Sequence, residues 1–201
     1  MCFHSKQSKT AQALKNRFNA TFEKEKDFSP ASAINGFTFP ATPVITNAAP
    51  TKIQLFNWGL LPSWATDISY RKNTLNAKIE TINEKPSFRQ SVNNRCLILV
   101  DGFYEWQWLD EKGKKKQRYL LALPKDELFC LAGIWNIWVD KSTGEIINTY
   151  TILTTEANEL MAKIHNSKKR MPVIVNKENE ENWLKGLEIK NNEINLEAIK
   201  E

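Results

Sequence analysis

The chain has 201 residues, of which 41% are hydrophobic and 25% charged, a composition typical of a folded globular protein rather than a disordered or fibrous one. The net charge of +5 is uneven, because residues 176–201 hold four Lys and seven Glu while residues 1–175 carry +8. A basic body with an acidic end favours an anionic partner such as nucleic acid, although many basic proteins bind none.

The first third of the chain predicts a helix, a strand and an unusual loop. Apolar residues spaced three and four apart predict an amphipathic helix within residues 8–22. Residues 28–50, rich in Pro, Ala, Thr and Asn, predict an irregular extended segment. The alternating residues 52–56 predict a strand that ends in the loop W-G-L-L-P-S-W (58–64). Loops normally face water, so the apolar character of this one suggests a special role.

The remaining sequence predicts mainly strands. Residues 95–100 and 103–108 flank the turn Asp101-Gly102 and read as strand, turn and strand. Further expected elements are strands at 117–123, 128–139, 146–153 and 171–175, and helices at 86–93, 156–164 (with Thr155 as N-cap) and 179–185. Successive antiparallel strands with few helices indicate an α+β fold, mainly a curled sheet or barrel with flanking helices. We expect one domain over residues 1–201, with an acidic helix and tail from about 176.

Few residues suit a metal or a disulfide framework. The chain has three cysteines, no CxxC pair and two histidines, so we expect no metal and no cofactor. Cys96 and Cys130 read as small apolar residues of buried strands.

The first residues lack an apolar signal core, and no apolar run approaches the ~20 residues of a membrane span. We therefore expect a cytoplasmic protein that binds no membrane.

Cys2 offers the most distinctive chemistry. Removal of Met1 is favoured when the next residue is small, and it would leave an α-amine and a thiol on adjacent carbons. An α-amine has a pKa of about 7.7–8.0, so part of it is neutral and nucleophilic at pH 7. It could condense with an aldehyde to an imine, on which the sulfur closes a thiazolidine, or Cys2 could attack a carbonyl as an N-terminal nucleophile. The alternative is an incidental residue in a frayed terminus.

Three further polar residues are candidates whose patterns leave ordinary explanations open. Glu105 lies between Tyr104 and Trp106, where partial desolvation would raise its pKa and suit proton transfer, or where it simply faces water. Asn76 could be a turn residue, and His165 could cap a helix.

Five sequence blocks occur in a telling order: M-C at the start, W-G-L-L-P-S-W, N-A-K-I-E-T-I-N-E-K-P-S-F-R, D-G-F-Y-E-W and H-N-S-K-K-R-M-P-V-I-V. Together they resemble the SRAP family (SOS response-associated peptidases), whose members attach covalently to abasic sites in single-stranded DNA. The resemblance runs from residue 1 to about 185. It implies the SRAP fold and a DNA-damage function linked to the SOS response.

The resemblance also implies roles for the candidate residues. Cys2, freed by autoproteolytic loss of Met1, would capture the sugar aldehyde as a thiazolidine and shield the lesion. Asn76 would hold the reacting group, Glu105 would move protons, and His165 would act on the sugar oxygen as the ring opens. Stalling at the imine would give weak lyase activity.

DNA would be held mainly through its phosphates. Lys78, Arg89 and Arg170 lie inside matched motifs and are candidate phosphate contacts, each with a solvated surface charge as its alternative. An apolar wedge or stacking surface is expected from Trp58, Leu61, Pro62 and Trp64, with Met171 and Pro172 lining the same groove. The lysine-rich run at 111–116 reads as a hairpin turn, with a DNA contact as the less favoured alternative. The expected partner is single-stranded DNA with abasic sites, and the protein is expected to be a monomer.

The chain departs from the family pattern near its start and near His165. Phe3 and His4 replace the usual Gly-Arg, Lys78 stands where Arg is usual, and the segment from His165 to Arg170 is longer and more basic.

Two other functions stay open. One is a cysteine autopeptidase or amidohydrolase that uses the Cys2 thiol, and the other is a noncovalent single-strand binding module with an inert Cys2.

Overall fold

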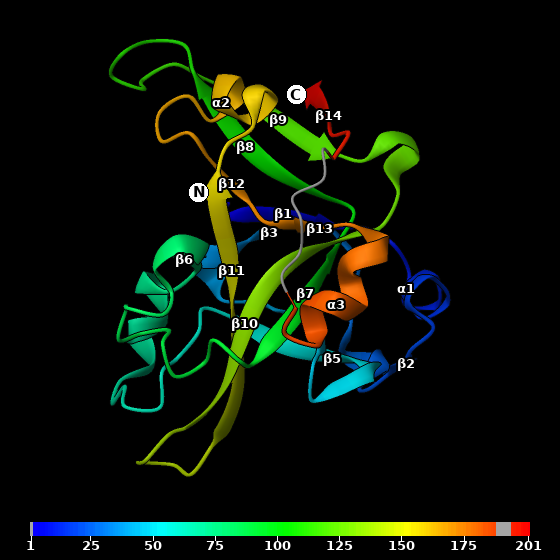
Figure 1. Ribbon diagram of the computed structural model, residues 1–201, viewed down its shortest axis with the longest axis vertical. Coiled ribbons are helices and arrows are strands. Elements are labelled where there is room, and N and C mark those ends of the chain that lie inside the picture. Colours follow the sequence, from blue (N-terminus) through cyan, green and yellow to red (C-terminus); the bar gives the residue numbers. More distant parts are fainter. Residues whose placement is uncertain (1, 188–193) are drawn as a thin grey trace.

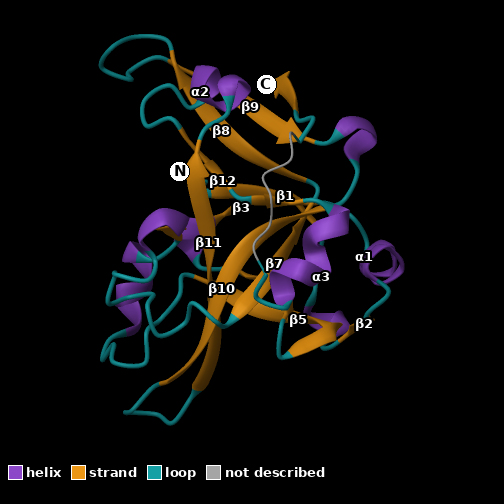
Figure 2. Ribbon diagram, viewed as in Figure 1, coloured by secondary structure: helices purple, strands orange, loops and turns teal. Residues whose placement is uncertain are grey.

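A computed structural model describes residues 2–187 and 194–201. Figure 2 shows strands through most of the molecule, with short helices at its periphery. The strands are β1 (His4–Gln7), β2 (Thr21–Phe22), β3 (Ala31–Asn35), β4 (Ala41–Thr46), β5 (Ala49–Trp58), β6 (Asn76–Lys78), β7 (Arg95–Val100), β8 (Gly102–Trp108), β9 (Lys116–Ala122), β10 (Phe129–Val139), β11 (Ile146–Glu156), β12 (Arg170–Pro172), β13 (Ile174–Val175) and β14 (Glu197–Lys200). The α-helices are α1 (Ala11–Phe18), α2 (Glu159–Ile164) and α3 (Glu180–Leu184).

Five strands close into a barrel. Strands β5, β4, β7, β10 and β11 pair in that order as antiparallel neighbours, and β11 then pairs with β5 in parallel at Thr149–Asn57 and Tyr150–Trp58. Gly133 of β10 allows the walls to approach, since a Cβ there would lie 2.4 Å from Ile98 Cδ1 and 2.7 Å from Thr151 O. The prediction of a mainly antiparallel curled sheet or barrel with few helices is confirmed.

A second sheet, in the order β14-β9-β8-β1-β3, lies beside the barrel (Figure 1). The chain passes from barrel strand β7 into β8 at Asp101, and β8 then pairs with β1 and β9. The expected simple hairpin at Asp101-Gly102 is therefore wrong, although both strands exist. Buried Asp101 stabilises the crossing by accepting hydrogen bonds from Ser8 N at 2.8 Å and Ser8 Oγ at 2.5 Å.

Several predicted elements need correction. Residues 28–50 contain β3 and β4 rather than an irregular segment, and residues 86–93 form turns. The helix expected from 156 begins at Glu159, because β11 continues to Glu156; Asn158, not Thr155, caps it by accepting from Met161 N at 2.9 Å. The expected strand 171–175 is divided into β12 and β13.

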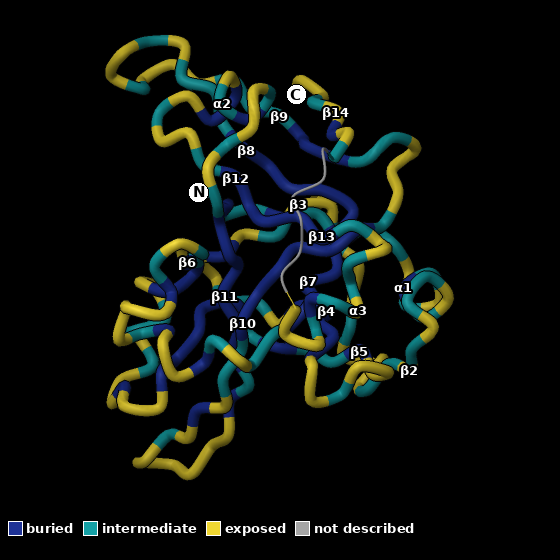
Figure 3. Tube along the Cα trace, in the orientation of Figure 1, coloured by how far each residue is buried: buried dark blue, intermediate teal, exposed yellow. Residues whose placement is uncertain are grey.

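The other predictions hold in outline. Helix α1 lies within 8–22, strand β5 contains residues 52–56, and α3 falls within 179–185. Strands β7 to β11 appear at the expected places. Figure 3 shows buried segments concentrated in the barrel and where β1 and β8 face it. No helix within the described ranges 2–187 and 194–201 is long and apolar enough to cross a membrane.

Trp183 is the buried residue of helix α3 where the helix docks on the barrel, and this gives a stability prediction. Trp183 is 4% exposed, its Nε1 donates to Cys96 O at 2.9 Å, and the Arg95 guanidinium lies 4.3 Å from its ring centroid. Trp183→Ala should lower the free energy of unfolding by about 3–5 kcal/mol, measured by urea denaturation. The neighbouring exposed Leu187 is the control, and Leu187→Ala should change the same quantity by less than about 0.5 kcal/mol. Equal effects of the two variants would contradict this account of α3.

Candidate functional site

Cys2 lies two residues before the start of β1 and is fully buried. It belongs to a core cluster that includes Phe103, Tyr150 and Met161, and its Sγ lies 3.6 Å from His4 O. Burial and the nearby Glu105 carboxylate raise the pKa of the Cys2 thiol well above its usual range, so the thiol is neutral at pH 7. Cys2 is therefore held by packing and is no frayed terminal residue.

Asn76 reaches Cys2 from the start of β6. This strand pairs in parallel with β11, where Asn76 is opposite Ile152. Asn76 Nδ2 donates to Cys2 O at 2.9 Å, which fixes the amide against the first residue of the site. Within residues 2–187 and 194–201, Asn76 Oδ1 is buried without a hydrogen-bond partner, so an acceptor remains available next to Cys2.

Glu105 faces inward from β8. Strand alternation places Glu105 on the same face as buried Phe103, whereas Tyr104 on the opposite face donates from its hydroxyl to Ser32 O at 2.6 Å. The side chain is 4% exposed, so the alternative of a solvated glutamate is wrong. Burial raises the pKa of Glu105 to about 7, which gives a carboxyl able both to accept and to donate a proton near neutral pH.

His165 ends helix α2, whose last residues pack against β8. Its backbone N donates to Met161 O at 2.7 Å, so the predicted helix-capping position is real. The ring is also buried, and Nδ1 lies 2.7 Å from Arg170 O and 3.3 Å from Arg170 N. The shorter contact is to a carbonyl, which only accepts, so it favours the tautomer with the proton on Nδ1. Burial lowers the pKa of His165, so the neutral ring presents Nε2 toward Glu105 Oε2, 4.0 Å away.

The four predicted catalytic candidates thus converge from four separate parts of the chain. Asn76 bonds to Cys2, Glu105 acts electrostatically on Cys2, and His165 faces Glu105. They meet where the second sheet lies against the barrel. Within the described part of the chain, no group of three or more His, Cys, Asp or Glu side chains is arranged to hold a metal ion.

The expected apolar wedge is wrong for three of its four residues. Trp58 and Leu61 have no exposed surface and Pro62 is buried, so no base can stack on them in this structure. Trp58 instead sits where β5 meets β11, stacks on Tyr150 at a centroid distance of 6.2 Å and donates from Nε1 to Leu75 O. Only Trp64 is exposed, at 45%. The apolar loop is thus explained by packing.

The expected phosphate contacts have unequal surroundings. Lys78 and Arg89 are exposed. Arg170 instead forms a two-pronged ion pair with Glu80, at 3.0 and 2.8 Å, and also donates to Thr154 O at 2.7 Å. Met171 and Pro172 are largely buried, but both line a cavity of about 680 Å³ beside helix α2, as expected. None of the four wedge residues lines this cavity, so it is not the shared groove that was expected.

Two residues near the site were not identified from the sequence. Glu80 lies in the same motif as Asn76, but its pairing with Arg170 links positions 90 residues apart, which no local pattern indicates. Tyr150 stacks on Trp58 and its hydroxyl lies 2.7 Å from Thr42 Oγ1. The strand pattern of β11 predicted only that Tyr150 would be in a sheet.

Comparison with known proteins identifies the family. The sequence profile described as SOS response associated peptidase (SRAP) matches residues 1–200. Abasic site processing protein YoqW of Bacillus subtilis (strain 168) is 42% identical over 142 residues, which is 70% of this chain and 61% of that protein. Abasic site processing protein HMCES of Gallus gallus is 33% identical over 156 residues, 66% of this chain and 45% of its own. The match therefore spans about three fifths of the Bacillus relative.

Solved structures agree with this fold. A protein from Bacteroides thetaiotaomicron superposes with a TM-score of 0.83 at 38% identity, over 91% of this chain and 81% of that one. A protein from Bordetella bronchiseptica superposes with a TM-score of 0.79 at 21% identity, over 99% of each chain, and shows the shared fold alone. The chain, with its barrel and its converging Cys2, Asn76, Glu105 and His165, belongs to the SOS response associated peptidase (SRAP) family.

Proposed function

We propose that this protein captures abasic sites in single-stranded DNA through a thiazolidine formed by Cys2 after removal of Met1. The observation that carries the proposal is the convergence of Cys2 with an amide, a carboxyl of raised pKa and a neutral imidazole. The matched regions of relatives described as abasic site processing proteins support the substrate class.

The first nucleophile is the amine rather than the thiol. The pKa of the buried Cys2 thiol is raised, whereas an exposed α-amine has a pKa of about 7.7–8.0. The neutral amine attacks C1′ of the ring-opened sugar, and the carbonyl oxygen takes up a proton from Glu105. Loss of water gives the imine. The Cys2 sulfur then adds to the imine carbon while its proton passes to nitrogen, which closes the five-membered ring and is favoured because it is intramolecular.

Asn76 and His165 act as positioning groups for the sugar. Asn76 Oδ1 is a buried acceptor beside Cys2 and can receive an amine or hydroxyl hydrogen. The 4.0 Å from His165 Nε2 to Glu105 Oε2 is too long for a direct hydrogen bond and suits a bridging sugar oxygen. If ring closure is delayed, the imine permits β-elimination, which would appear as weak lyase activity.

DNA is held by exposed cations and one exposed aromatic ring. Lys78 and Arg89 supply phosphate contacts, and Trp64 offers a ring for a base to stack on. We infer a monomer that acts on DNA in the cytoplasm.

The test is a denaturing gel with single-stranded DNA in which one uracil has been excised. The protein should give a heat-stable shifted band with this DNA and none with the uncut control strand. Turnover of an amide substrate without any shifted band would instead favour the amidohydrolase function. Salt-sensitive binding without a covalent band would favour a noncovalent binding module.

The ion pair between Glu80 and Arg170 gives a second prediction. The pair is partly exposed, so its contribution to stability is small, about 0–1 kcal/mol. Glu80→Gln should release the Arg170 guanidinium for phosphate and strengthen binding of lesion-free single-stranded DNA several-fold at low salt, measured by fluorescence anisotropy. Arg170→Gln should weaken the same binding. An unchanged affinity in Glu80→Gln would show that Arg170 does not serve the DNA.

A further inference from the structure

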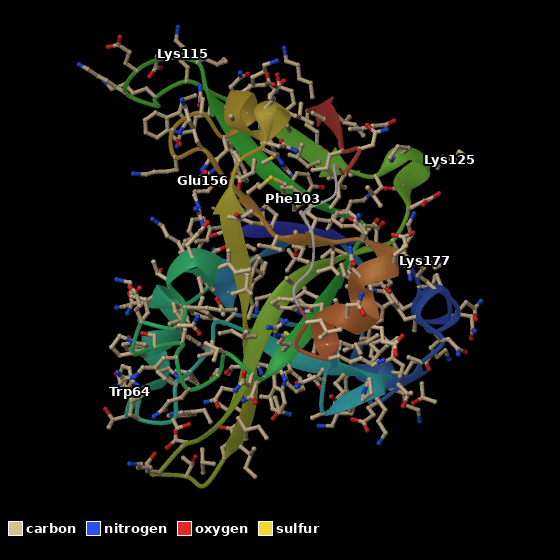
Figure 4. The ribbon with its side chains drawn as sticks, in the orientation of Figure 1. Trp64, Phe103, Lys115, Lys125, Glu156 and Lys177 are labelled. Atoms are coloured by element: carbon tan, nitrogen blue, oxygen red, sulfur yellow. The ribbon has the colours of Figure 1, made fainter. Side chains whose placement is uncertain are left out.

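The hairpin between β8 and β9 continues outward from the site. Strand β8 carries Glu105 and runs three residues further to Trp108, about 10 Å at ~3.3 Å per residue. Its tip holds the exposed Lys112, Lys114 and Lys115. Figure 4 shows Lys115 at the far end of this projection, well away from the body of the protein.

The tip is a fixed turn rather than a loose lysine-rich loop. The Asp110 carboxylate accepts hydrogen bonds from Lys114 N at 2.9 Å and Lys115 N at 2.7 Å. Gly113 has a φ of +62°, and a Cβ there would lie 2.5 Å from the Trp108 ring, so the turn closes directly on that ring. The lysine side chains therefore leave a defined backbone, and Asp110 is engaged by its own turn.

A second basic segment is attached to this hairpin. Asn166 accepts from Trp108 N at 3.0 Å and donates to Trp108 O at 2.9 Å, as a neighbouring strand would. Gln107 Nε2 also donates to Lys163 O at 3.1 Å. The loop after His165 is thereby held beside the hairpin, and both project at the same end of the molecule (Figure 1).

The two segments together form one cationic surface, the lysine arm, made of Lys112, Lys114, Lys115, Lys116, Lys163, Lys168 and Lys169. All seven side chains are exposed. Within residues 108–116 and 163–170 the only acidic residues are Asp110 and Glu111, so positive charge dominates. The second segment is joined to the site by its backbone, because Lys169 N donates to His165 O at 2.8 Å.

We propose that the lysine arm binds the phosphate backbone of the DNA that flanks the captured lesion on one side. The inference rests on the proposed function, since it takes the Cys2 site as the position of the lesion. A row of exposed cations that starts about 10 Å from Glu105 and runs outward matches a strand of phosphates leaving the site. The lysine run predicted from sequence as a turn is indeed a turn, and the partner loop adds Lys168 and Lys169 to its positive charge.

The experiment compares two triple variants of the full chain. The arm variant is Lys112→Gln, Lys114→Gln and Lys115→Gln, and the matched control is Lys26→Gln, Lys141→Gln and Lys177→Gln, which removes three exposed lysines from other parts of the surface. Figure 4 shows Lys177 on the opposite side from Lys115. Equilibrium binding of lesion-free DNA is measured over a range of salt concentrations, and equal thermal midpoints verify folding.

The arm variant should bind at least about 10-fold more weakly at ~0.1 M salt, with a log affinity against log salt slope shallower by about 2 if three phosphate contacts are lost. The control should match the unmodified protein. Oligonucleotides with the lesion near either end, and with single- or double-stranded flanks, should show the difference for one flank only and reveal which strand form the arm prefers.

Equal affinities and slopes for the arm and control variants on every flank would overturn the proposal. Covalent capture of a short oligonucleotide that ends near the lesion should be the same in both variants. If the unmodified protein forms no covalent band at all but the arm variant still loses binding, the proposed capture chemistry fails and the arm stands.

Discussion

Cys2→Ala should abolish the covalent band with abasic single-stranded DNA while leaving salt-sensitive binding of the same strand in place. The substitution retains the amine but removes the sulfur that closes the ring, so the reaction stops at a hydrolysable imine. Denaturing gels after heating measure the covalent product, and anisotropy measures binding.

Matched controls come from the other two cysteines. Cys96 and Cys130 are also fully buried, and burial raises the pKa of each thiol, but they lie in barrel strands. Cys96→Ala and Cys130→Ala should keep the covalent band. Cys2→Ser should give less heat-stable product, because an oxazolidine forms less readily. A normal heat-stable band from Cys2→Ala would contradict the ring-closing role of the sulfur.

Glu105→Gln should slow covalent capture by about 10²–10⁴-fold, the usual range for removal of a general acid–base group. In the unmodified protein the rate should pass through a maximum near neutral pH, because Glu105 must hold the proton that it donates and loses it at about pH 7, whereas the α-amine becomes nucleophilic only as it loses its own proton slightly above. The variant should lose the fall that Glu105 causes and retain only the rise that belongs to the amine. Single-turnover rates between pH 5.5 and 8.5 measure both effects.

The stability of the same variant separates catalysis from folding. A carboxyl whose pKa is raised in the folded state binds its proton more tightly there than in the unfolded chain, so Glu105 lowers stability progressively as pH rises from about 4 to 7. Glu105→Gln should therefore be at least as stable as the unmodified protein at pH 8. The exposed Glu156 at the end of β11 is the control, and Glu156→Gln should keep the full rate. A fast Glu105→Gln variant would remove Glu105 from the mechanism.

Local patterns predicted the strands well but not how they join. Alternation and apolar runs located β5 and β7 to β11, because each of these strands buries side chains in the core, either in the barrel or in the second sheet. The parallel closure at Thr149–Asn57 and the crossing at Asp101 depend on contacts between distant segments, which no window of sequence contains. The start of α2 was misplaced because β11 continues to Glu156 and leaves Asn158 to cap the helix.

The candidate site was predicted more completely than its surroundings. The ordered motifs identified Cys2, Asn76, Glu105 and His165, and the structure brings them together. The same motifs suggested that Trp58 and Leu61 would contact DNA, whereas closure of the barrel buries both. A residue type within a motif indicates importance, but only the fold determines whether its side chain faces solvent or the core.

Mass spectrometry of the amino-terminal peptide, before and after incubation with abasic DNA and nuclease digestion, tests the central claim most directly. The peptide should begin at Cys2, and after the reaction it should gain the mass of the open-chain sugar less one water on that residue. A peptide that retains Met1, or a sugar attached elsewhere in the chain, would contradict capture by the Cys2 aminothiol.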